Sequence, residues 1–255
     1  MSKSIQRVVV NEIGGPEHLI LEEVEIGPGK DSQVLIEQLA IGVNYIDTYF
    51  RRGVYPTKLP AVIGDQAVGR VVDVGSDVNH LAKGNTVAYT SVFGSYTSKR
   101  WMDTAKLVIM PNDLSEDVIA GTLTRGCTAE YLLFRLFDVQ EGHTILVHAA
   151  VGGTGVIMCQ WAKALGATVI GTVGNTAKIP MAEKLGCDHV LVHENEDFVA
   201  QVLDITDGAK VDVVYDSIGR DTFDKSLRCV KPRGLLVAYG NASGKPEPFD
   251  VLRLN

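Results

Sequence analysis

The chain has 255 residues, of which 45% are hydrophobic and 22% charged, as is usual for a globular protein. This length allows two domains or one large α/β domain. The formal net charge of -7 argues against a general affinity for nucleic acid or for acidic membranes.

Cysteine and histidine spacing gives no sign of a disulfide framework or a metal site. Cys127, Cys159, Cys187 and Cys229 lie far apart without a Cys-x-x-Cys pair, so we expect four buried, reduced thiols. The six histidines show no His-x-x-x-His spacing, and no metal is predicted. The N-terminus lacks an apolar signal core, and no stretch approaches the roughly 20 apolar residues of a membrane span. A cytoplasmic location is therefore expected.

The first half of the sequence is typical of a β-rich domain. Strands are predicted over 33–40, 69–75 and 86–89, where apolar residues alternate or form short runs. Turn signals recur between the strands, at 14–16, 27–29 and 83–85, as expected for short strands joined by frequent turns. This pattern predicts a small barrel-like domain.

The second half alternates strands and helices. Strands are predicted over 144–150, 168–173, 189–192, 211–216 and 234–239, and helices over 132–137, 177–186, 197–206 and 221–229. A further helix follows residue 155, with Ile157, Trp161, Ala164 and Leu165 on one face and Gly166 at its end. This series predicts a parallel sheet with right-handed crossovers. We place the domain boundary near 120–128, giving domains 1–126 and 127–255.

A glycine-rich turn follows the strand predicted at 144–150. It contains Ala150, Gly152, Gly153, Thr154 and Gly155, a variant of the GxGxxG pattern with alanine first. Amides of such a turn can approach a diphosphate closely, and the dipole of the following helix favours negative charge. The turn therefore predicts a dinucleotide site, with a glycine-rich loop that binds nothing as the alternative.

The residues after the second predicted strand of this half bear on the choice of dinucleotide. An NAD site usually carries an acid there, which binds the ribose 2′-hydroxyl. Residues 173–178 contain no carboxylate, whereas Gly174 and Asn175 offer amides and Lys178 a positive charge, which suit a 2′-phosphate. We therefore predict NADPH rather than NADH. The alternative is that Lys178 is only a solvated lysine.

A polar and aromatic cluster lies in the first half, between residues 44 and 55. Its members are Asn44, Tyr45, Asp47, Thr48, Tyr49, Arg51, Arg52 and Tyr55. Such a cluster favours a cleft wall that hydrogen-bonds to and stacks on a flat substrate. A tyrosine-rich surface turn is the alternative interpretation.

Together these features resemble the zinc-independent quinone oxidoreductases, the zeta-crystallin-like branch of the medium-chain dehydrogenases/reductases. The resemblance runs over essentially the whole chain and is carried by residues 14–17, 41–49, 64–75, 148–155, 160–163, 216–222 and 239–244. It implies an α/β protein in which a GroES-like β-barrel domain joins a Rossmann domain with a doubly wound parallel sheet. The family pattern continues past Asn255, so we expect the Rossmann domain to be incomplete at its C-terminal end.

The resemblance also implies roles for single residues. Asn44, Tyr49 and Tyr55 would line the pocket of the nicotinamide and the substrate. Thr128 and the 152–155 turn would hold the diphosphate of NADPH. The remaining cofactor contacts that it implies are Gly174, Asn175, Lys178, His193, Ser217, Asn241 and Ser243. A homodimer is implied as well.

The chemistry of the acceptor is consistent with this assignment. Hydride reduction of an aldehyde or ketone builds up alkoxide charge, which enzymes meet with a metal or a strong proton donor. The sequence suggests neither. A quinone accepts electrons into a conjugated system whose oxyanion is far less basic, so NADPH-dependent quinone reduction is predicted. Reduction of activated alkenes (enones and enals) is the nearest alternative, and a non-catalytic NADPH-binding or RNA-binding protein is the third.

Overall fold

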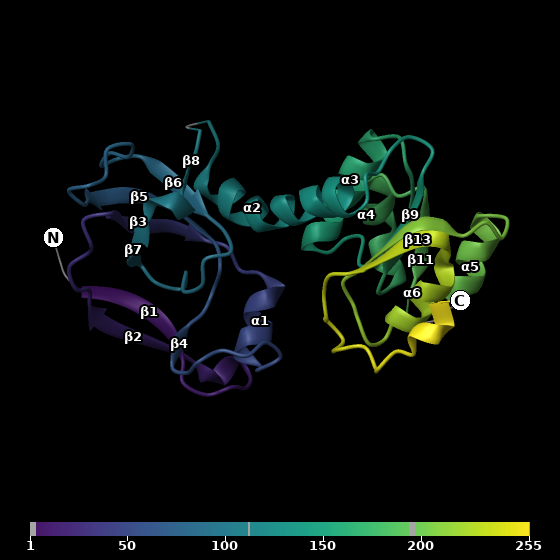
Figure 1. Ribbon diagram of the computed structural model, residues 1–255, viewed down its shortest axis with the longest axis horizontal. Helices are drawn as coiled ribbons and strands as arrows, with labels where there is room; N and C mark the ends of the chain where they lie inside the picture. Colours follow the sequence, from purple (N-terminus) through teal and green to yellow (C-terminus); the bar gives the residue numbers. More distant parts are fainter. Residues whose placement is uncertain (1–3, 112, 194–196, 255) are drawn as a thin grey trace. The chain divides into compact units, whose positions relative to one another are not determined.

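The computed structural model describes residues 4–111, 113–193 and 197–254 (Figure 1). The chain divides into two compact units, Met1–Thr124 and Arg125–Asn255. Helix α2 (Glu116–Glu130) runs across this division. Each unit builds its own sheets around its own apolar core.

The first unit consists of two antiparallel sheets and helix α1 (Tyr45–Arg51). The smaller sheet has the order β2-β1-β4, with β1 (Ser4–Val10), β2 (Leu19–Glu25) and β4 (Ala61–Val62). The larger has the order β7-β3-β5-β6-β8, with β3 (Gln33–Ile41), β5 (Ala67–Val74), β6 (Thr86–Tyr89), β7 (Lys99–Asp103) and β8 (Val108–Ile109). Short 3-10 turns η1 (Pro16–His18) and η2 (Thr104–Lys106) join strands. The strands predicted in this half are therefore confirmed.

Alternation along the strands builds the core of the first unit. Val34 and Ile36 of β3 are buried, as are Val87 and Tyr89 of β6. Side chains two residues apart on a strand point to the same face of the sheet. Because these positions repeat every second residue, the apolar pattern of the sequence by itself selects the buried face.

The second unit has one parallel sheet of order β11-β10-β9-β12-β13. Its strands are β9 (Thr144–Val147), β10 (Thr168–Val173), β11 (His189–Val192), β12 (Val211–Asp216) and β13 (Val230–Ala238). The helices are the π-helical η3 (Tyr131–Leu136), α3 (Gly153–Ala164), η4 (Thr176–Lys178), α4 (Ile179–Lys184), α5 (Phe198–Ile205), α6 (Phe223–Cys229) and η5 (Val251–Leu254). The predicted parallel sheet is confirmed.

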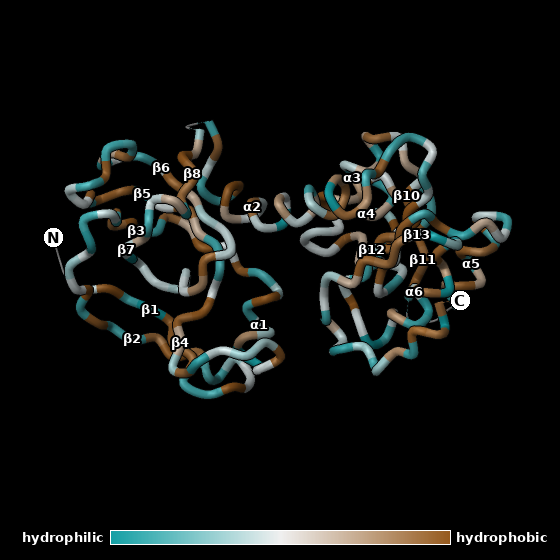
Figure 2. Tube along the Cα trace, viewed as in Figure 1, coloured by the Kyte–Doolittle hydropathy of each residue, from teal (hydrophilic) through white to brown (hydrophobic). Residues whose placement is uncertain are grey.

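Apolar residues cover both faces of this sheet. Ile145 and Val147 of β9 pack in one cluster with residues of η3, α3 and α4. Leu146, between them, belongs to a second cluster with residues of α5 and α6. Figure 2 shows the apolar character running along the strands of this unit. Helices on both faces of a parallel sheet make this unit doubly wound.

Three expectations need correction. Strand β9 ends at Val147 rather than at residue 150, because Ala149 adopts a left-handed φ of 52°, which an extended strand does not contain. Helix α3 buries Met158, Cys159 and Ala162 most deeply; of the face expected from the sequence, Ile157, Trp161 and Leu165 pack partly buried against the same core, and only Ala164 is exposed. Small residues let the helix approach the sheet, while Trp161 packs at its flank against Phe134, with ring centroids 5.1 Å apart.

The third correction concerns the cysteines. Cys159, Cys187 and Cys229 are buried free thiols as predicted, but Cys127 is exposed. Its position in helix α2 puts it on the outer side of a helix, where periodicity rather than residue type decides burial. Among the residues that the structure describes, no helix combines the length and the apolar character that crossing a bilayer requires.

Candidate functional site

The glycine turn joins the carboxyl end of β9 to helix α3. Gly152 caps the helix with extended backbone, and Gly155 lies in its first turn. A Cβ atom on Gly155 would lie 2.3 Å from the carbonyl oxygen of Ala149 and 2.8 Å from that of Ala150. Because these neighbours are backbone atoms that cannot move aside, only glycine lets the helix start this close to the strand.

The start of helix α3 has unused hydrogen-bond donors. Within the described part of the chain, the amides of Gly153, Thr154 and Gly155 meet no acceptor, and Gly152 supplies no side-chain cap. A Cβ on Gly153 would lie 2.7 Å from Nε of Arg125, so this guanidinium reaches the start of the helix. Free amides, a helix dipole and an arginine suit a diphosphate, and the residues present therefore fit a dinucleotide.

The other predicted cofactor residues of the second unit follow the carboxyl ends of neighbouring strands. They are Gly174, Asn175 and Lys178 after β10, His193 after β11, Ser217 after β12, and Asn241 and Ser243 after β13. The carboxyl ends of parallel strands share one edge of the sheet, where doubly wound proteins bind ligands. The fold thus gathers residues from five separate turns along this edge, with the glycine turn after the central strand β9 in the middle.

The turn after β10 is open. The amide of His193 donates to the carbonyl of Val173 at 2.9 Å, which brings His193 beside Gly174. A Cβ on Gly174 would meet no atom within 4 Å. Lys178 is exposed, and no carboxylate occurs between 173 and 178. This end of the edge has room and positive charge for a phosphate group.

The surroundings of Ser243 and Thr128, two further predicted contact residues, are also defined. The hydroxyl of Ser243 donates to the carbonyl of Ile218 at 2.9 Å and accepts from the amide of Asp221 at 3.1 Å. This hydroxyl therefore holds together the loops after β12 and β13. Thr128 lies in α2, about one helical turn after Arg125. The two residues therefore share one helix.

A buried histidine supports the glycine turn from beneath. The imidazole of His148 is fully buried, and its Nδ1 lies 3.0 Å from Oγ1 of Thr172. The same oxygen accepts from the amide of Ala149 at 3.3 Å. Burial lowers the pKa of His148 to about 4, so the ring is neutral at physiological pH. A neutral, enclosed imidazole is consistent with packing rather than proton transfer to a substrate.

Helix α1 builds an aromatic wall in the first unit. The rings of Tyr49 and Tyr55 meet edge to face with centroids 5.1 Å apart, and Phe50 contacts both Tyr55 and Phe93. The amide of Tyr55 donates to the carbonyl of Tyr49 at 3.2 Å. Tyr49 is 5% exposed, whereas Tyr55 is half-buried. The structure therefore brings the two predicted tyrosines together.

Asn44 precedes this helix and is fixed by several hydrogen bonds. Its Nδ2 donates to Oδ1 of Asp65 at 3.1 Å and to Oε1 of Gln66 at 2.9 Å. Its backbone amide donates to Oδ2 of Asp47 at 2.9 Å. Since both hydrogens of the side-chain amide are used, Asn44 offers a ligand its carbonyl oxygen.

Two buried carboxyl groups flank Asn44. Burial raises the pKa of Asp47, and the nearby Asp65 adds to the shift; burial likewise raises the pKa of Asp65. Oδ2 of Asp47 also accepts from the hydroxyl of Tyr96 at 2.8 Å, while its Oδ1 has no partner among the described residues. Sequence reasoning missed Tyr96, because it lies 49 residues from its partner Asp47 and no local pattern connects the two.

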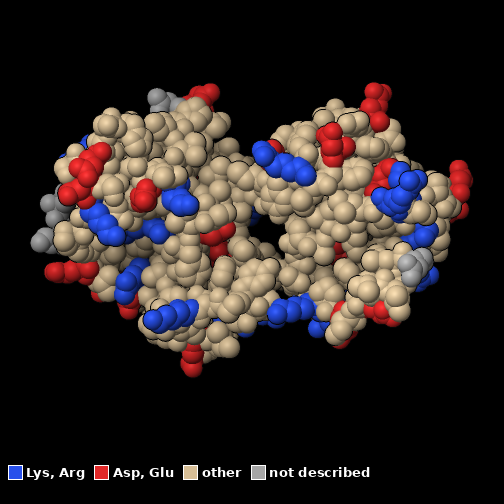
Figure 3. All heavy atoms as spheres, in the orientation of Figure 1, with Lys and Arg blue, Asp and Glu red and all other residues tan. Residues whose placement is uncertain are grey.

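The described residues also include potential metal ligands and charged surface side chains. Within the described ranges, no three His, Cys, Asp or Glu side chains come together to hold a metal ion. Figure 3 shows basic and acidic side chains interspersed over the visible face of each unit. The chemistry available at the described site is thus that of amides, hydroxyls, buried carboxyls and single cations.

Comparison with known proteins identifies the family. An "Alcohol dehydrogenase GroES-like domain" model matches residues 30–140, and a "Zinc-binding dehydrogenase" model matches residues 153–255. Quinone oxidoreductase 1 of Escherichia coli K12 is 43% identical over 242 residues, which cover 93% of this chain and 73% of that protein. The chain belongs to the quinone oxidoreductase family. A 2-haloacrylate reductase from a Burkholderia species is also 43% identical, over 97% of this chain and 77% of the relative.

Solved structures of the quinone oxidoreductase family agree in fold. The Escherichia coli quinone oxidoreductase, crystallised with NADPH, has a TM-score of 0.92 and 42% identity and covers 98% of this chain. This chain in turn covers 77% of that structure. The predicted combination of a GroES-like domain with a Rossmann domain, and the zeta-crystallin-like branch of the medium-chain dehydrogenases/reductases, are therefore confirmed.

Proposed function

We propose that this protein is an NADPH-dependent quinone oxidoreductase that transfers hydride without a metal. The observation that carries the proposal is the start of helix α3, where three free amides and Arg125 face the open edge of the sheet. Membership of the quinone oxidoreductase family supports it. When bound, NADPH supplies the hydride. We assign cofactor binding to residues 127–255, with Arg125 just before them, and substrate binding to the rest of residues 1–126.

The residues after each strand would divide the cofactor between them. Gly152 to Gly155 and Thr128 would hold the diphosphate through amides and a hydroxyl, and Ala150 would shape the turn. Gly174, Asn175, Lys178 and His193 would bind the 2′-phosphate side, where positive charge and free space coincide. Ser217, Asn241 and Ser243 would border the nicotinamide half. Ser243 would contact the cofactor through its backbone, since its hydroxyl already hydrogen-bonds to Ile218 and Asp221.

The first unit would bind and orient the acceptor. Tyr55 would provide ring surface for a flat quinone, backed by the largely buried ring of Tyr49, and the tyrosine hydroxyls would donate to the quinone oxygen as negative charge develops. Asn44 is a rigid acceptor rather than a donor, because both of its amide hydrogens are used. A quinone suits this arrangement, since a weakly basic phenolate needs no strong acid beside it.

A second candidate reaction is the reduction of activated alkenes. The 43% identity to a 2-haloacrylate reductase over nearly the whole chain supports it. A conjugated alkene, like a quinone, spreads the incoming charge over several atoms. The same tyrosine hydroxyls could stabilise the enolate oxygen that results.

The decisive experiment combines binding and turnover. NADPH and NADH are titrated separately while the fluorescence of Trp161 and Trp101 is followed, and NADPH oxidation is then measured with 1,4-benzoquinone and, in parallel, with cyclohexenone. Tighter binding of NADPH and faster turnover of the quinone support the proposal. Faster turnover of the enone favours the alkene reductase. Tight NADPH binding without any turnover favours a non-catalytic protein, whose affinity for RNA is then tested by filter binding.

Assembly and location are further proposals. We propose a homodimer, as the family resemblance implies, and light scattering coupled to gel filtration measures the molar mass directly. A cytoplasmic location and low affinity for nucleic acid are proposed from the composition and the net charge of -7. Cell fractionation tests the first, and the filter-binding assay tests the second.

A further inference from the structure

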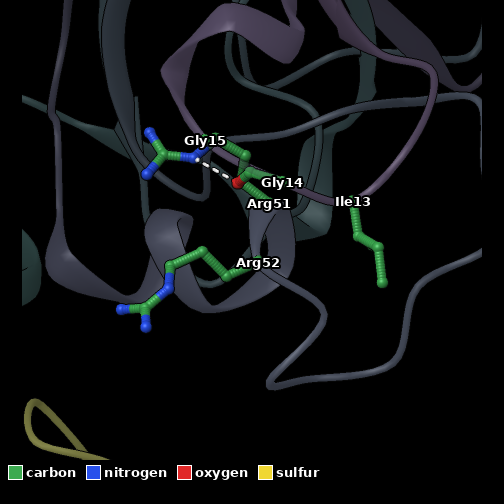
Figure 4. A pocket seen from close by; sticks show the side chains of 5 residues that line it. All are labelled: Ile13, Gly14, Gly15, Arg51 and Arg52. Carbon is green, nitrogen blue, oxygen red and sulfur yellow. Dashed lines mark hydrogen bonds between the residues drawn. The ribbon is translucent and has the colours of Figure 1, made fainter.

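A shallow pocket in the first unit includes Arg51 and Arg52, two members of the predicted 44–55 cluster to which no separate role has been given above. It is lined by Ile13, Gly14, Gly15, Arg51 and Arg52 and has a volume of about 510 Å³ (Figure 4). Two segments meet there, the loop after β1 and the C-terminal end of helix α1. The amide of Gly14 donates to the carbonyl of Arg51 at 2.9 Å, and Nε of Arg51 donates to the carbonyl of Gly14 at 3.3 Å. These reciprocal bonds fix the first arginine against the loop.

The pocket carries positive charge without a matching acid. The guanidinium groups of Arg51 and Arg52 extend toward the same side in Figure 4, away from Ile13. Neither makes an ion pair within 4.0 Å in the part of the chain that is described. The pKa of Glu17 is lowered, chiefly by a backbone hydrogen bond. The charge of Arg51 makes only the smallest contribution to this shift, so Glu17 is not a close partner of the arginine. Its Oε1 accepts from the amide of Gly15 instead.

The arginines of this pocket lie close in sequence to Tyr49 and Tyr55 of the aromatic wall. The amide of Arg52 donates to the carbonyl of Thr48, and Tyr55 donates to the carbonyl of Tyr49. Arg52 therefore lies about one helical turn from Tyr49, at i+3, where helix neighbours share a face. An acceptor whose ring contacts Tyr49 and Tyr55 could extend a substituent toward the arginines.

We propose that Arg51 and Arg52 form an oxyanion site that selects acceptors bearing a carboxylate or sulfonate group. Arginine presents several N–H donors in a planar arrangement that matches such a group with two parallel hydrogen bonds. Arg51 uses its Nε on Gly14 and keeps its terminal nitrogens for a ligand. The proposal is supported by two neighbouring cations that make no ion pair among the described residues, in a chain whose net charge is -7. The proposal rests on the quinone reductase function.

The kinetic test compares a matched pair of acceptors, 1,2-naphthoquinone and 1,2-naphthoquinone-4-sulfonate. The measured quantity is the ratio of kcat/KM for the sulfonate to kcat/KM for the neutral quinone. In R52Q this ratio falls about fivefold, as expected for one partly solvated charge-assisted contact. In K58Q, which removes an exposed lysine outside the pocket, it stays within error. An unchanged ratio in R52Q, or an equal fall in K58Q, overturns the proposal.

A binding test separates failure of this proposal from failure of the proposed function. Naphthalene-1-sulfonate, which cannot be reduced, is titrated calorimetrically into the whole chain and into R52Q and K58Q. About fivefold weaker binding to R52Q alone supports the oxyanion site even if no quinone is turned over. Equal binding to all three proteins refutes it. Inorganic phosphate is titrated alongside: if it binds as tightly as the sulfonate and with the same dependence on Arg52, the pocket holds a free anion rather than an acceptor.

Discussion

The imidazole Nε2 of His148 lies 2.9 Å from the hydroxyl oxygen of Ser226, within a line of buried polar groups that ends at Asp216. Ser226 donates its proton to Oδ2 of Asp216 at 2.8 Å, so it accepts from His148. Nε2 therefore carries the proton. Nδ1 of the ring accepts from Thr172, whose oxygen receives the amide of Ala149.

This line connects the core of the second unit to the glycine turn. Asp216 is further held by the hydroxyl of Thr222 and by the amides of Ile218 and Gly219. Each buried donor in this line has an acceptor, so the groups fix one another. The left-handed backbone at Ala149, with φ of 52°, is thereby supported from beneath, and the turn is held open toward solvent.

The first prediction concerns acid stability. The folded protein holds the pKa of His148 at about 4, below the unfolded value of about 6.5. Between these values the unfolded chain binds a proton that the folded protein does not, so the free energy of unfolding falls as the pH is lowered. The loss reaches roughly 3 kcal/mol by pH 4. Urea unfolding at several pH values should show a flatter pH dependence in H148Q, and parallel curves would refute this assignment.

The second prediction concerns the close approach of helix α3 to β9. Gly155→Ala should lower the free energy of unfolding by about 2 kcal/mol or more, because the new Cβ meets two backbone carbonyls. Gly174→Ala is the control, since its Cβ meets nothing within 4 Å. We expect its stability to stay within about 0.5 kcal/mol of the wild type. Equal losses in the two variants, measured by urea unfolding, would contradict the role given to Gly155.

The third prediction tests the choice of coenzyme. Lys178→Glu should raise KM for NADPH about tenfold and KM for NADH little, because only NADPH carries the 2′-phosphate that a carboxylate repels. Lys184→Glu makes the same change of charge at another exposed lysine on the following helix. It should leave the ratio of the two KM values unchanged. If Lys178→Glu affects both coenzymes alike, the 2′-phosphate assignment is wrong.

The fourth prediction tests the aromatic wall. Tyr55→Phe should lower kcat with 1,4-benzoquinone about threefold while the Kd for NADPH stays constant, because the variant removes a hydroxyl donor and keeps the ring. Tyr45→Phe serves as the control, since Tyr45 begins helix α1, ten residues before Tyr55, and is 55% exposed. Steady-state kinetics and fluorescence titration measure the two quantities. A change in the Kd for NADPH with kcat unaltered would assign Tyr55 to the coenzyme instead.

The sequence alone determined the architecture of the second unit and the position of the glycine turn between β9 and α3. Alternating strands and helices allowed only a parallel sheet, and the glycine pattern 150–155 located the start of helix α3, because both signals are local in the chain. The sequence misjudged the end of β9, and it did not show that Met158, Cys159 and Ala162 are the most deeply buried residues of α3. The end of β9 depends on the backbone conformation of Ala149, and the packing of α3 depends on which side chains let the helix approach the sheet.

Only the tertiary structure decided how the candidate residues work together. Asn44 became an acceptor because Asp65 and Gln66 take its amide hydrogens. Tyr96 joined the site through Asp47, and His148 became part of the support of the turn through Thr172 and Ser226. These partners lie far apart in the chain. Which acceptor a donor binds depends on the distance and angle between them in the folded protein, and residue spacing in the sequence does not reveal these.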